Sequence, residues 1–265
     1  MDTGVFELPN AICTDSGQWV REVELAEMTG EEEDILADQT RMVGKGKLAK
    51  RADQRMTEIL SRCTVRLGDW RRPDGKDRFN APNFFFKAWE NAYTNDRAFA
   101  IIKLRQVSLG DEMVIEETCP ACGKELKRVE VNLNDLKANP IDFEIACKTH
   151  RKVTLPKSKD VVTWRVFTGR EEALLEEIQA SRKGDLLSAV LQARITEVNG
   201  VTPDDVLEYV KRLSQMDRRF FSKHIDDAEG GLDTSLQIGC DGCGHEFERT
   251  VNIGNKSFFF PSEVG

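Results

Sequence analysis

The sequence contains little of what catalysis requires. It has only three histidines among 265 residues, too few and too scattered for a histidine-based catalytic group. Neither the Gly-x-Ser-x-Gly motif of many hydrolases nor the His-Glu-x-x-His motif of metalloproteases occurs. The glycine- and lysine-containing stretch 44–47 also lacks the pattern that binds nucleotide phosphates. We therefore expect a protein that is not an enzyme.

Long hydrophobic runs and a surplus of positive charge are missing as well. No stretch of about 18 apolar residues is present, which excludes a membrane-spanning helix. The first residues carry acids where a secretory signal carries lysines, so we expect synthesis and folding in a cytosol. The formal net charge is −8. Because nucleic-acid binding depends on Lys and Arg side chains that neutralise phosphates, this charge argues against a nucleic-acid partner.

Four of the seven cysteines lie in two segments that are nearly copies of each other, Cys119-Pro-Ala-Cys122-Gly and Cys240-Asp-Gly-Cys243-Gly. Two residues between the cysteines allow both thiolates to face one ion from a tight turn, and one such turn supplies half of a tetrahedral site. In a reducing cytosol this clustering favours a metal over disulfides. We therefore predict one zinc ion bound by Cys119, Cys122, Cys240 and Cys243. Four thiolates leave no open coordination position, so the zinc would be structural.

Other interpretations of the cysteines remain open. Redox-active thiols or disulfides are one, although a redox Cys-x-x-Cys pair normally opens a helix and these pairs precede strand-like sequence. Cys147 and His150 form a Cys-x-x-His pair that could complete a site with one of the turns. His245 occupies the position that Lys124 takes in the first copy, so we do not expect it to bind the metal.

The hydrophobic pattern predicts an α+β fold of mixed helices and short antiparallel strands, with a zinc-ribbon-like element built from the two distant Cys-x-x-Cys turns. We divide the chain into four regions: an N-terminal strand and helical region (1–110), a region with the first cysteine turn and β structure (111–168), a helical region (169–230), and a region with the second cysteine turn and a C-terminal strand and tail (231–265).

Several local predictions follow from spacing and from residues that start or stop helices. The expected elements are a helix over 47–66 with Cys63 in the core, a loop over 67–83, a buried helix over 98–107 stopped by Gly110, a strand over 141–145 that pairs with 151–155, a helix that starts at Pro203, and a helix with its start at Ser214 that carries a packed His224.

A strand that leads into the sequence Thr-Gly-x-Glu occurs twice, at Thr29–Glu32 and at Thr168–Glu171. In each copy the Thr and the Glu can cap the start of a helix reciprocally, and the second of these helices would carry Leu174, Leu175 and Ile178. Together with the two cysteine turns, this repetition suggests an internal duplication or pseudo-symmetry.

Two clusters of three phenylalanines, at 84–86 and 258–260, have two possible roles. Exposed aromatic clusters mark interfaces, so both could be anchors for a partner protein. Equally, both could pack in the core.

A set of segments in a fixed order carries a family resemblance. They are Val20-Arg21-Glu22 before 28–36, Asn95-Asp96-Arg97, the first cysteine turn, Trp164 to Gly169, Cys240 to Phe247, and Phe258-Phe259-Phe260-Pro261. In this order the chain resembles the baseplate proteins of contractile-tailed bacteriophages, the group described as T-even-type baseplate hub or hub-assembly proteins.

The resemblance implies a structural or assembly role that is performed by protein surfaces. It implies other tail and baseplate proteins as partners, the host cytoplasm as the place of assembly, and the tail baseplate of the virion as the final location. Two alternatives remain: an assembly chaperone for the hub that is absent from the mature virion, or, in a different class, a zinc-ribbon regulator that binds nucleic acid.

Overall fold

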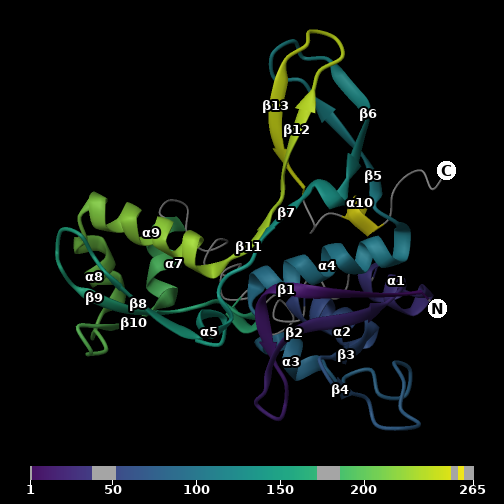
Figure 1. Cartoon of the computed structure of the whole chain (residues 1–265). Helices are drawn as coiled ribbons and strands as arrows, with labels where there is room; N and C mark the ends of the chain where they lie inside the picture. The colour runs from purple at the N-terminus through teal and green to yellow at the C-terminus, as the bar shows by residue number, and fades with distance from the viewer. Residues whose placement is uncertain (1, 38–51, 172–185, 252–255, 260–265) are drawn as a thin grey trace.

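The computed structural model describes residues 2–37, 52–171, 186–251 and 256–259. Within these ranges the chain folds into two helix-and-sheet bodies and a pair of long hairpins that project away from them (Figure 1). The predicted α+β class, with short antiparallel strands, is confirmed.

The first body is built on a four-stranded antiparallel sheet with helices packed against it. The strands follow the order β1-β2-β3-β4. Their bounds are β1 (Thr3–Cys13), β2 (Trp19–Ala26), β3 (Thr64–Leu67) and β4 (Trp70–Arg71), and the helices are α1 (Gly30–Ala37), α2 (Ala52–Cys63), α3 (Phe86–Asn91) and α4 (Thr94–Leu109).

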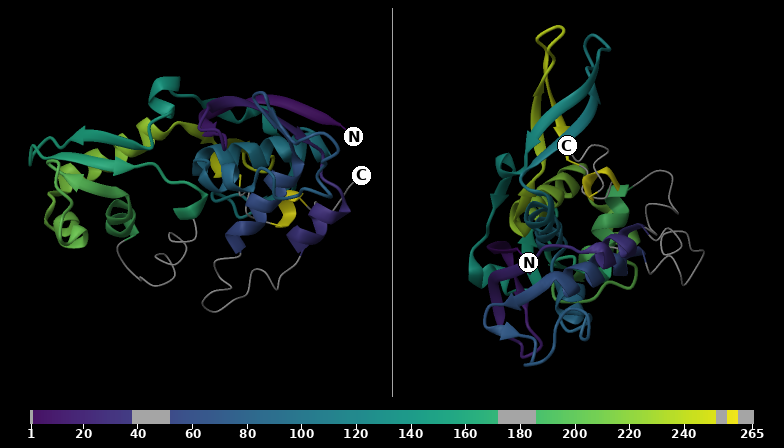
Figure 2. Two further views of the ribbon diagram at one scale, coloured as in Figure 1. Left: turned by 90° about the horizontal axis from the view of Figure 1, so that it is seen from below. Right: turned by 90° about the vertical axis from the view of Figure 1, so that its right-hand side faces the viewer.

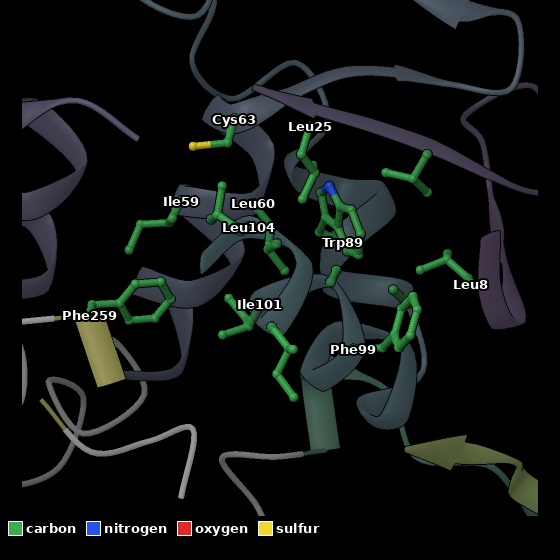
Figure 3. Packing of buried hydrophobic residues seen from close by; sticks show 14 of the residues in the cluster. Leu8, Leu25, Ile59, Leu60, Cys63, Trp89, Phe99, Ile101, Leu104 and Phe259 are labelled. Atoms are coloured by element: carbon green, nitrogen blue, oxygen red, sulfur yellow. The ribbon is translucent and has the colours of Figure 1, made fainter. Parts of the chain in front are cut away.

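The core of the first body lies between this sheet and α4, and Figure 3 shows its packing. Trp89, Leu25 and Ile59 are fully buried, and α4 buries residues on nearly every side, as predicted for 98–107. The helix ends at Gly110, whose φ of 85° is strained for any residue with a side chain. Cys63 is buried in this core as predicted.

The second body has a three-stranded sheet in the order β10-β9-β8. Trp164 and Phe221 are fully buried at its centre. Its strands are β8 (His150–Thr154), β9 (Val161–Arg165) and β10 (Ile195–Val198), and its helices are α7 (Leu186–Arg194), α8 (Val206–Arg212) and α9 (Gln215–Glu229).

The two projecting hairpins carry the cysteine turns. The first consists of β5 (Glu112–Thr118) and β6 (Glu125–Asn132), and the second of β12 (Ser235–Gly239) and β13 (Glu246–Thr250). Four further elements lie between these parts: the 3₁₀ turn η3 (Leu133–Asp135), β7 (Lys137–Asn139), which pairs with β11 (Gly231–Asp233), and α5 (Phe143–Ala146). The last described element, α10 (Lys256–Phe259), packs on α4 of the first body.

The order of elements repeats along the chain, which supports the predicted internal duplication. In each repeat an antiparallel strand pair leads into the Thr-Gly-x-Glu box, and a later helix runs directly into a third strand that pairs with the second. Two more helices follow, the last ends at a glycine with positive φ, and the chain then enters a cysteine hairpin. We call residues 3–132 the first repeat and residues 150–250 the second repeat.

The two capping boxes have the same hydrogen bonds. The backbone N–H and hydroxyl of Thr29 donate to Glu32 Oε2 at 2.9 and 2.8 Å. Those of Thr168 donate to Glu171 Oε2 at 2.9 and 2.6 Å. In both boxes the Glu side chain therefore reaches back to the Thr, as the sequence predicts. The other half of the predicted cap differs, because the amides of Glu32 and Glu171 donate at 3.0 Å to the backbone carbonyls of Thr29 and Thr168 and not to their hydroxyls. The helix residues Leu174, Leu175 and Ile178 lie outside the described residues.

Two predicted elements are wrong. The segment 141–145 is not a strand, because the Asp142 carboxylate accepts a hydrogen bond from the Glu144 amide at 2.8 Å and caps the short helix α5. The strand β8 pairs instead with β9. Pro203 does not start a helix either: α8 starts at Val206, where Asp205 accepts from the Glu208 amide at 2.9 Å.

Three boundaries also differ from the predictions. The helix expected to reach residue 66 ends at Cys63, because the next four residues pair with β2. The expected loop over 67–83 contains the short strand β4. The region 169–230, predicted to be helical, contains β10. For β3 and β10, pairing with a strand that is distant in the sequence overrides the local pattern, whereas β4 forms a tight hairpin with the neighbouring β3. The start expected for the first of these helices, residues 47–51, lies outside the described residues.

The phenylalanine clusters contribute to the first core. Phe85 and Phe258 are almost fully buried, Phe259 is 5% exposed, and Phe84 packs against the core from a half-buried position. Phe260 lies outside the described residues. For Phe85, Phe258 and Phe259, the structure therefore supports a role in the core.

Candidate metal centre

The two cysteine hairpins lie side by side, and their turns meet at the tip of the projection (Figures 1 and 2). The four sulfur atoms of Cys119, Cys122, Cys240 and Cys243 all lie within 4.8 Å of one another. The structure therefore brings together the four residues that the sequence singles out. Among the described residues, these four cysteines form a group whose ligand atoms lie close enough together to hold one metal ion.

The sulfur separations fit a tetrahedral site. Cys119 Sγ lies 3.8 Å from Cys243 Sγ, and Cys122 Sγ lies 3.7 Å from Cys240 Sγ. A zinc ion with four Zn–S bonds of about 2.3 Å at tetrahedral angles places its sulfurs about 3.8 Å apart. A disulfide needs about 2.0 Å between the sulfurs. The spacing is therefore compatible with four thiolates around one ion and too long for a disulfide.

The two turns have matching backbone geometry. The amide of Cys119 donates to Lys124 O and that of Cys240 donates to His245 O, both at 2.9 Å. The glycine after each Cys-x-x-Cys has a φ of 72°, in the left-handed region that favours glycine. In each turn the first cysteine is buried and the second exposed. The close pairs join the buried cysteine of one turn to the exposed cysteine of the other, which gives the cluster an approximate two-fold symmetry.

The pKa values of two thiols in the cluster are shifted in opposite directions. Although burial acts to raise it, the pKa of Cys119 is lowered to about 6, because its sulfur accepts hydrogen bonds from the amides of Cys122 and Ala121. The pKa of Cys243 is raised to about 12: the amide of His245 acts to lower it, but hydrogen bonding with the other cysteines and burial outweigh that effect. The Cys119 thiolate thus forms readily, and its negative charge opposes the ionisation of a neighbouring thiol. A divalent cation offsets this repulsion and so favours the deprotonated form of the ligands.

Polar pairs connect the hairpins around the cluster. Lys124 Nζ lies 3.0 Å from Asp241 Oδ2, which joins one turn to the other, and Arg249 Nε donates to Glu117 Oε2 at 2.9 Å lower down. These pairs were not predicted from the sequence. The signal for the first was present: Lys124 directly follows one Cys-x-x-Cys-Gly turn, and Asp241 lies within the other.

The remaining candidate ligands lie outside the cluster. His245 stacks on Phe247 with 6.2 Å between ring centroids. Cys147 ends α5 and His150 begins β8, so this Cys-x-x-His pair does not join either cysteine turn. His224 is half-buried and lies edge-on to Trp164, as expected for a packed histidine.

The fold and the cluster define a class: an α+β protein with two distant hairpins that meet in a zinc-ribbon-like, four-cysteine element. Comparison with family models is more specific. The model described as "T4 bacteriophage base plate protein" matches residues 9–260, nearly the whole chain, and the protein belongs to this family. No curated protein matches the chain, and no solved structure does.

Family membership confirms the resemblance seen in the sequence. It indicates a structural or assembly role in a phage baseplate and contacts with other baseplate or tail proteins. Among the helices that the structure describes, none has both the length and the apolar character needed to cross a bilayer.

Proposed function

We propose that the protein is a non-enzymatic component of the hub region of a contractile phage tail baseplate. It acts through protein–protein contacts, is incorporated into the baseplate in the host cytoplasm during assembly, and remains in the mature virion. The observation that carries this proposal is the family match over residues 9–260. The projecting hairpins and the two bodies offer extended surfaces of the kind that an assembly protein uses (Figure 2).

The location is tested by quantitative mass spectrometry of purified phage particles. A baseplate component gives peptides in a fixed ratio to other baseplate proteins. If the protein is required for tail assembly but is absent from the particles, it acts as an assembly chaperone, and the proposal of a virion component is wrong. The same samples should include tail assembly intermediates, where both roles predict its presence.

We further propose that the four-cysteine cluster binds one structural zinc ion. The sulfur spacing of 3.7 and 3.8 Å and the four thiol ligands support zinc as the metal. Four thiolates leave no open coordination position, which supports a structural role for the ion. The ion would connect cysteines 118 positions apart in the chain (Cys122 and Cys240) and so fasten the end of the second repeat to the first. Because the ligands of such a site come together only on folding, its binding free energy contributes to folding.

Metal analysis of protein purified under reducing conditions tests this site. We expect one zinc per chain, and replacement by Co²⁺ should give the absorption bands of a tetrahedral tetrathiolate site. The Cys240→Ser variant should lose the metal, while Cys147→Ser, which changes a cysteine outside the cluster, should keep it. Metal-free protein with four reduced thiols would show the zinc assignment to be wrong and would leave the baseplate role untouched.

A further inference from the structure

A cavity of about 640 Å³ lies between α5, β8 and α9 in the second repeat. Its wall includes Ile141 and Ile145 from the α5 segment, His150 and Lys152 from β8, and His224 and Ala228 from α9. None of these residues belongs to the cysteine cluster. We call this cavity the β8 groove.

The groove lies along an open edge of the sheet. In the order β10-β9-β8, no other described strand pairs with β8. The cavity touches three consecutive residues of β8, His150, Arg151 and Lys152. Because successive side chains of a strand point to opposite faces, a cavity in contact with all three reaches around the edge of the strand.

The backbone of β8 presents free hydrogen-bonding groups at this edge. Thr149 O accepts from the Val166 amide at 3.0 Å, and the Leu155 amide donates to Asp160 O at 2.9 Å, in the same register. In an antiparallel ladder the groups of alternate residues face the partner strand. The N–H and C=O groups of His150, Lys152 and Thr154 therefore point away from β9.

One side of the groove continues into an exposed apolar stripe. Met216, Phe220, His224 and Ala228 follow one another at four-residue intervals along one face of α9. Met216 is 61% exposed and Phe220 44%, and the ring of Phe220 stacks on His224. Across the groove, Ile145 is 44% exposed. An apolar side chain placed here would be covered from both sides.

The residues that line the groove also carry a surplus of positive charge. They include Lys148, Arg151 and Lys152 against two carboxylates, Asp142 and Asp227. Asp142 is already engaged as the cap of α5. Nε and Nη2 of the buried Arg151 have no hydrogen-bond partner among the described residues. In a chain of net charge −8, this local excess of positive charge favours an acidic ligand.

We propose that β8 accepts an extended segment of another protein as a fourth strand, and that this segment alternates apolar with acidic residues. Its backbone would pair with His150, Lys152 and Thr154, its apolar side chains would enter the groove beside α9, and its acids would meet Lys148 and Lys152. This deepens the assembly role proposed above by naming a contact surface, and rests on it for the existence of a partner protein.

A second copy of the same chain fits this edge poorly. Symmetric pairing of two β8 edges would place the lysines of one copy close to those of the other. Lysine on an exposed edge is a common protection against this kind of self-association. An acidic partner strand turns the same lysines into attractive contacts.

The test is a titration of the intact zinc-loaded protein with a fluorescein-labelled decapeptide of alternating Glu and Val residues, followed by fluorescence anisotropy. We expect saturable binding in the micromolar range. The same peptide with N-methyl groups along one backbone edge, and a peptide of alternating Lys and Val, should not bind. These synthetic probes test the surface alone, so their result is independent of whether the protein is found in virions.

Variants of one residue locate the binding site. Lys152→Pro removes an edge-facing N–H and leaves the bonds to β9 in place, and Lys152→Glu reverses the charge without changing the backbone. Each should weaken binding at least about tenfold. Val5→Pro is the matched control, since Val5 occupies the corresponding edge-facing position of β1 in the first repeat and is 55% exposed. It should leave binding unchanged.

Three results would overturn the proposal. The first is no binding of the Glu and Val peptide at millimolar concentration. The second is binding that both Lys152 variants leave unchanged. The third is a dimer in analytical ultracentrifugation that Lys152→Glu dissociates, since it would identify a second copy of the chain as the occupant.

Discussion

Glu32 is completely buried in the first body, and its carboxylate has several hydrogen-bonding and charged partners. Its replacement therefore tests how much a buried charge contributes to the stability of this body. Its carboxylate accepts hydrogen bonds from the Thr29 amide at 2.9 Å and from Arg62 Nε at 2.6 Å, and it lies 3.6 Å from Arg78 Nη1. Both arginine side chains are less than a tenth exposed. The Glu32→Gln substitution keeps the size of the side chain and removes the charge that both guanidinium groups face. Because it removes the buried counter-charge that Arg62 and Arg78 share and leaves only the exposed Glu31 paired with Arg62, we expect the free energy of unfolding to fall by about 3–5 kcal/mol.

The pH dependence of stability should change in the same variant. Burial acts to raise the pKa of Glu32, but hydrogen bonds from Arg62 and Thr29 and the charge of Arg78 lower it below its ordinary value of 4.5. A carboxyl whose pKa is lower in the folded state stabilises the fold above the unfolded-state pKa, and this contribution disappears as the pH falls through the folded-state value. The wild-type protein should therefore lose stability below about pH 4.5, and Glu32→Gln should lose less over that range.

The second repeat supplies a matched control. Glu171 makes the same two hydrogen bonds to its threonine, but its nearest cation, Arg165 Nη1, lies 3.5 Å away on a side chain that is 36% exposed. Glu171→Gln should therefore cost only about 1 kcal/mol. Urea unfolding followed by circular dichroism measures both values in zinc-loaded protein. A cost below about 1 kcal/mol for Glu32→Gln, or equal costs for both variants, would refute the assignment of Glu32 as a buried counter-charge.

Three further predictions concern other parts of the molecule. Removal of the metal by a chelator, or by Cys240→Ser, should lower the midpoint of thermal unfolding, whereas Cys147→Ser should change this midpoint little. Equal midpoints for the metal-loaded and metal-free protein would contradict a structural role for the metal. Asp96→Asn should cost about 2 kcal/mol, because the buried Asp96 carboxylate accepts from two backbone amides of β1 at 2.9 and 3.1 Å and the amide side chain leaves one of them unpaired. Burial also raises the pKa of Asp96 to about 7. The contribution of this carboxyl group to stability is therefore greatest below its unfolded-state pKa near 3.8 and declines as the pH rises through 7. This decline should be absent in Asp96→Asn. Tyr93→Phe should cost about 1 kcal/mol in urea unfolding, because the buried Tyr93 hydroxyl donates to a backbone carbonyl at 2.7 Å; an unchanged midpoint would show that this bond contributes nothing.

The parts of the fold that short-range chemistry determines were predictable from the sequence. The two Cys-x-x-Cys-Gly turns, the capping boxes at Thr29 and Thr168, and the stop of α4 at Gly110 all depend on residues within one turn of each other. The prediction that the four cysteines meet depended on chemistry as well, because half a tetrahedral site in each turn requires the other half.

The parts that depend on distant partners were not predictable. The apolar residues Ile141, Phe143 and Ile145 alternate as in a strand, yet the Asp142 cap and the pairing of β8 with β9 make this segment a helix. The strand β10 is recognisable only through its pairing with β9. The β8 groove was not predictable from the sequence either, because its walls come from residues 141–152 and 224–228 and no local pattern connects these two segments.

The repeated order of elements gives the proposed metal site a structural reason for its position. A two-stranded hairpin is marginally stable alone, and each cysteine hairpin projects from its body with little cover (Figure 1). The apolar cluster that joins the hairpins is small, with Leu126, Ile238 and Phe247 beside the two buried cysteines. Neither repeat can complete a tetrahedral site from its own two thiolates, so the proposed ion would bind only when both hairpins are formed and adjacent. Metal binding would therefore couple the folding of the two repeats.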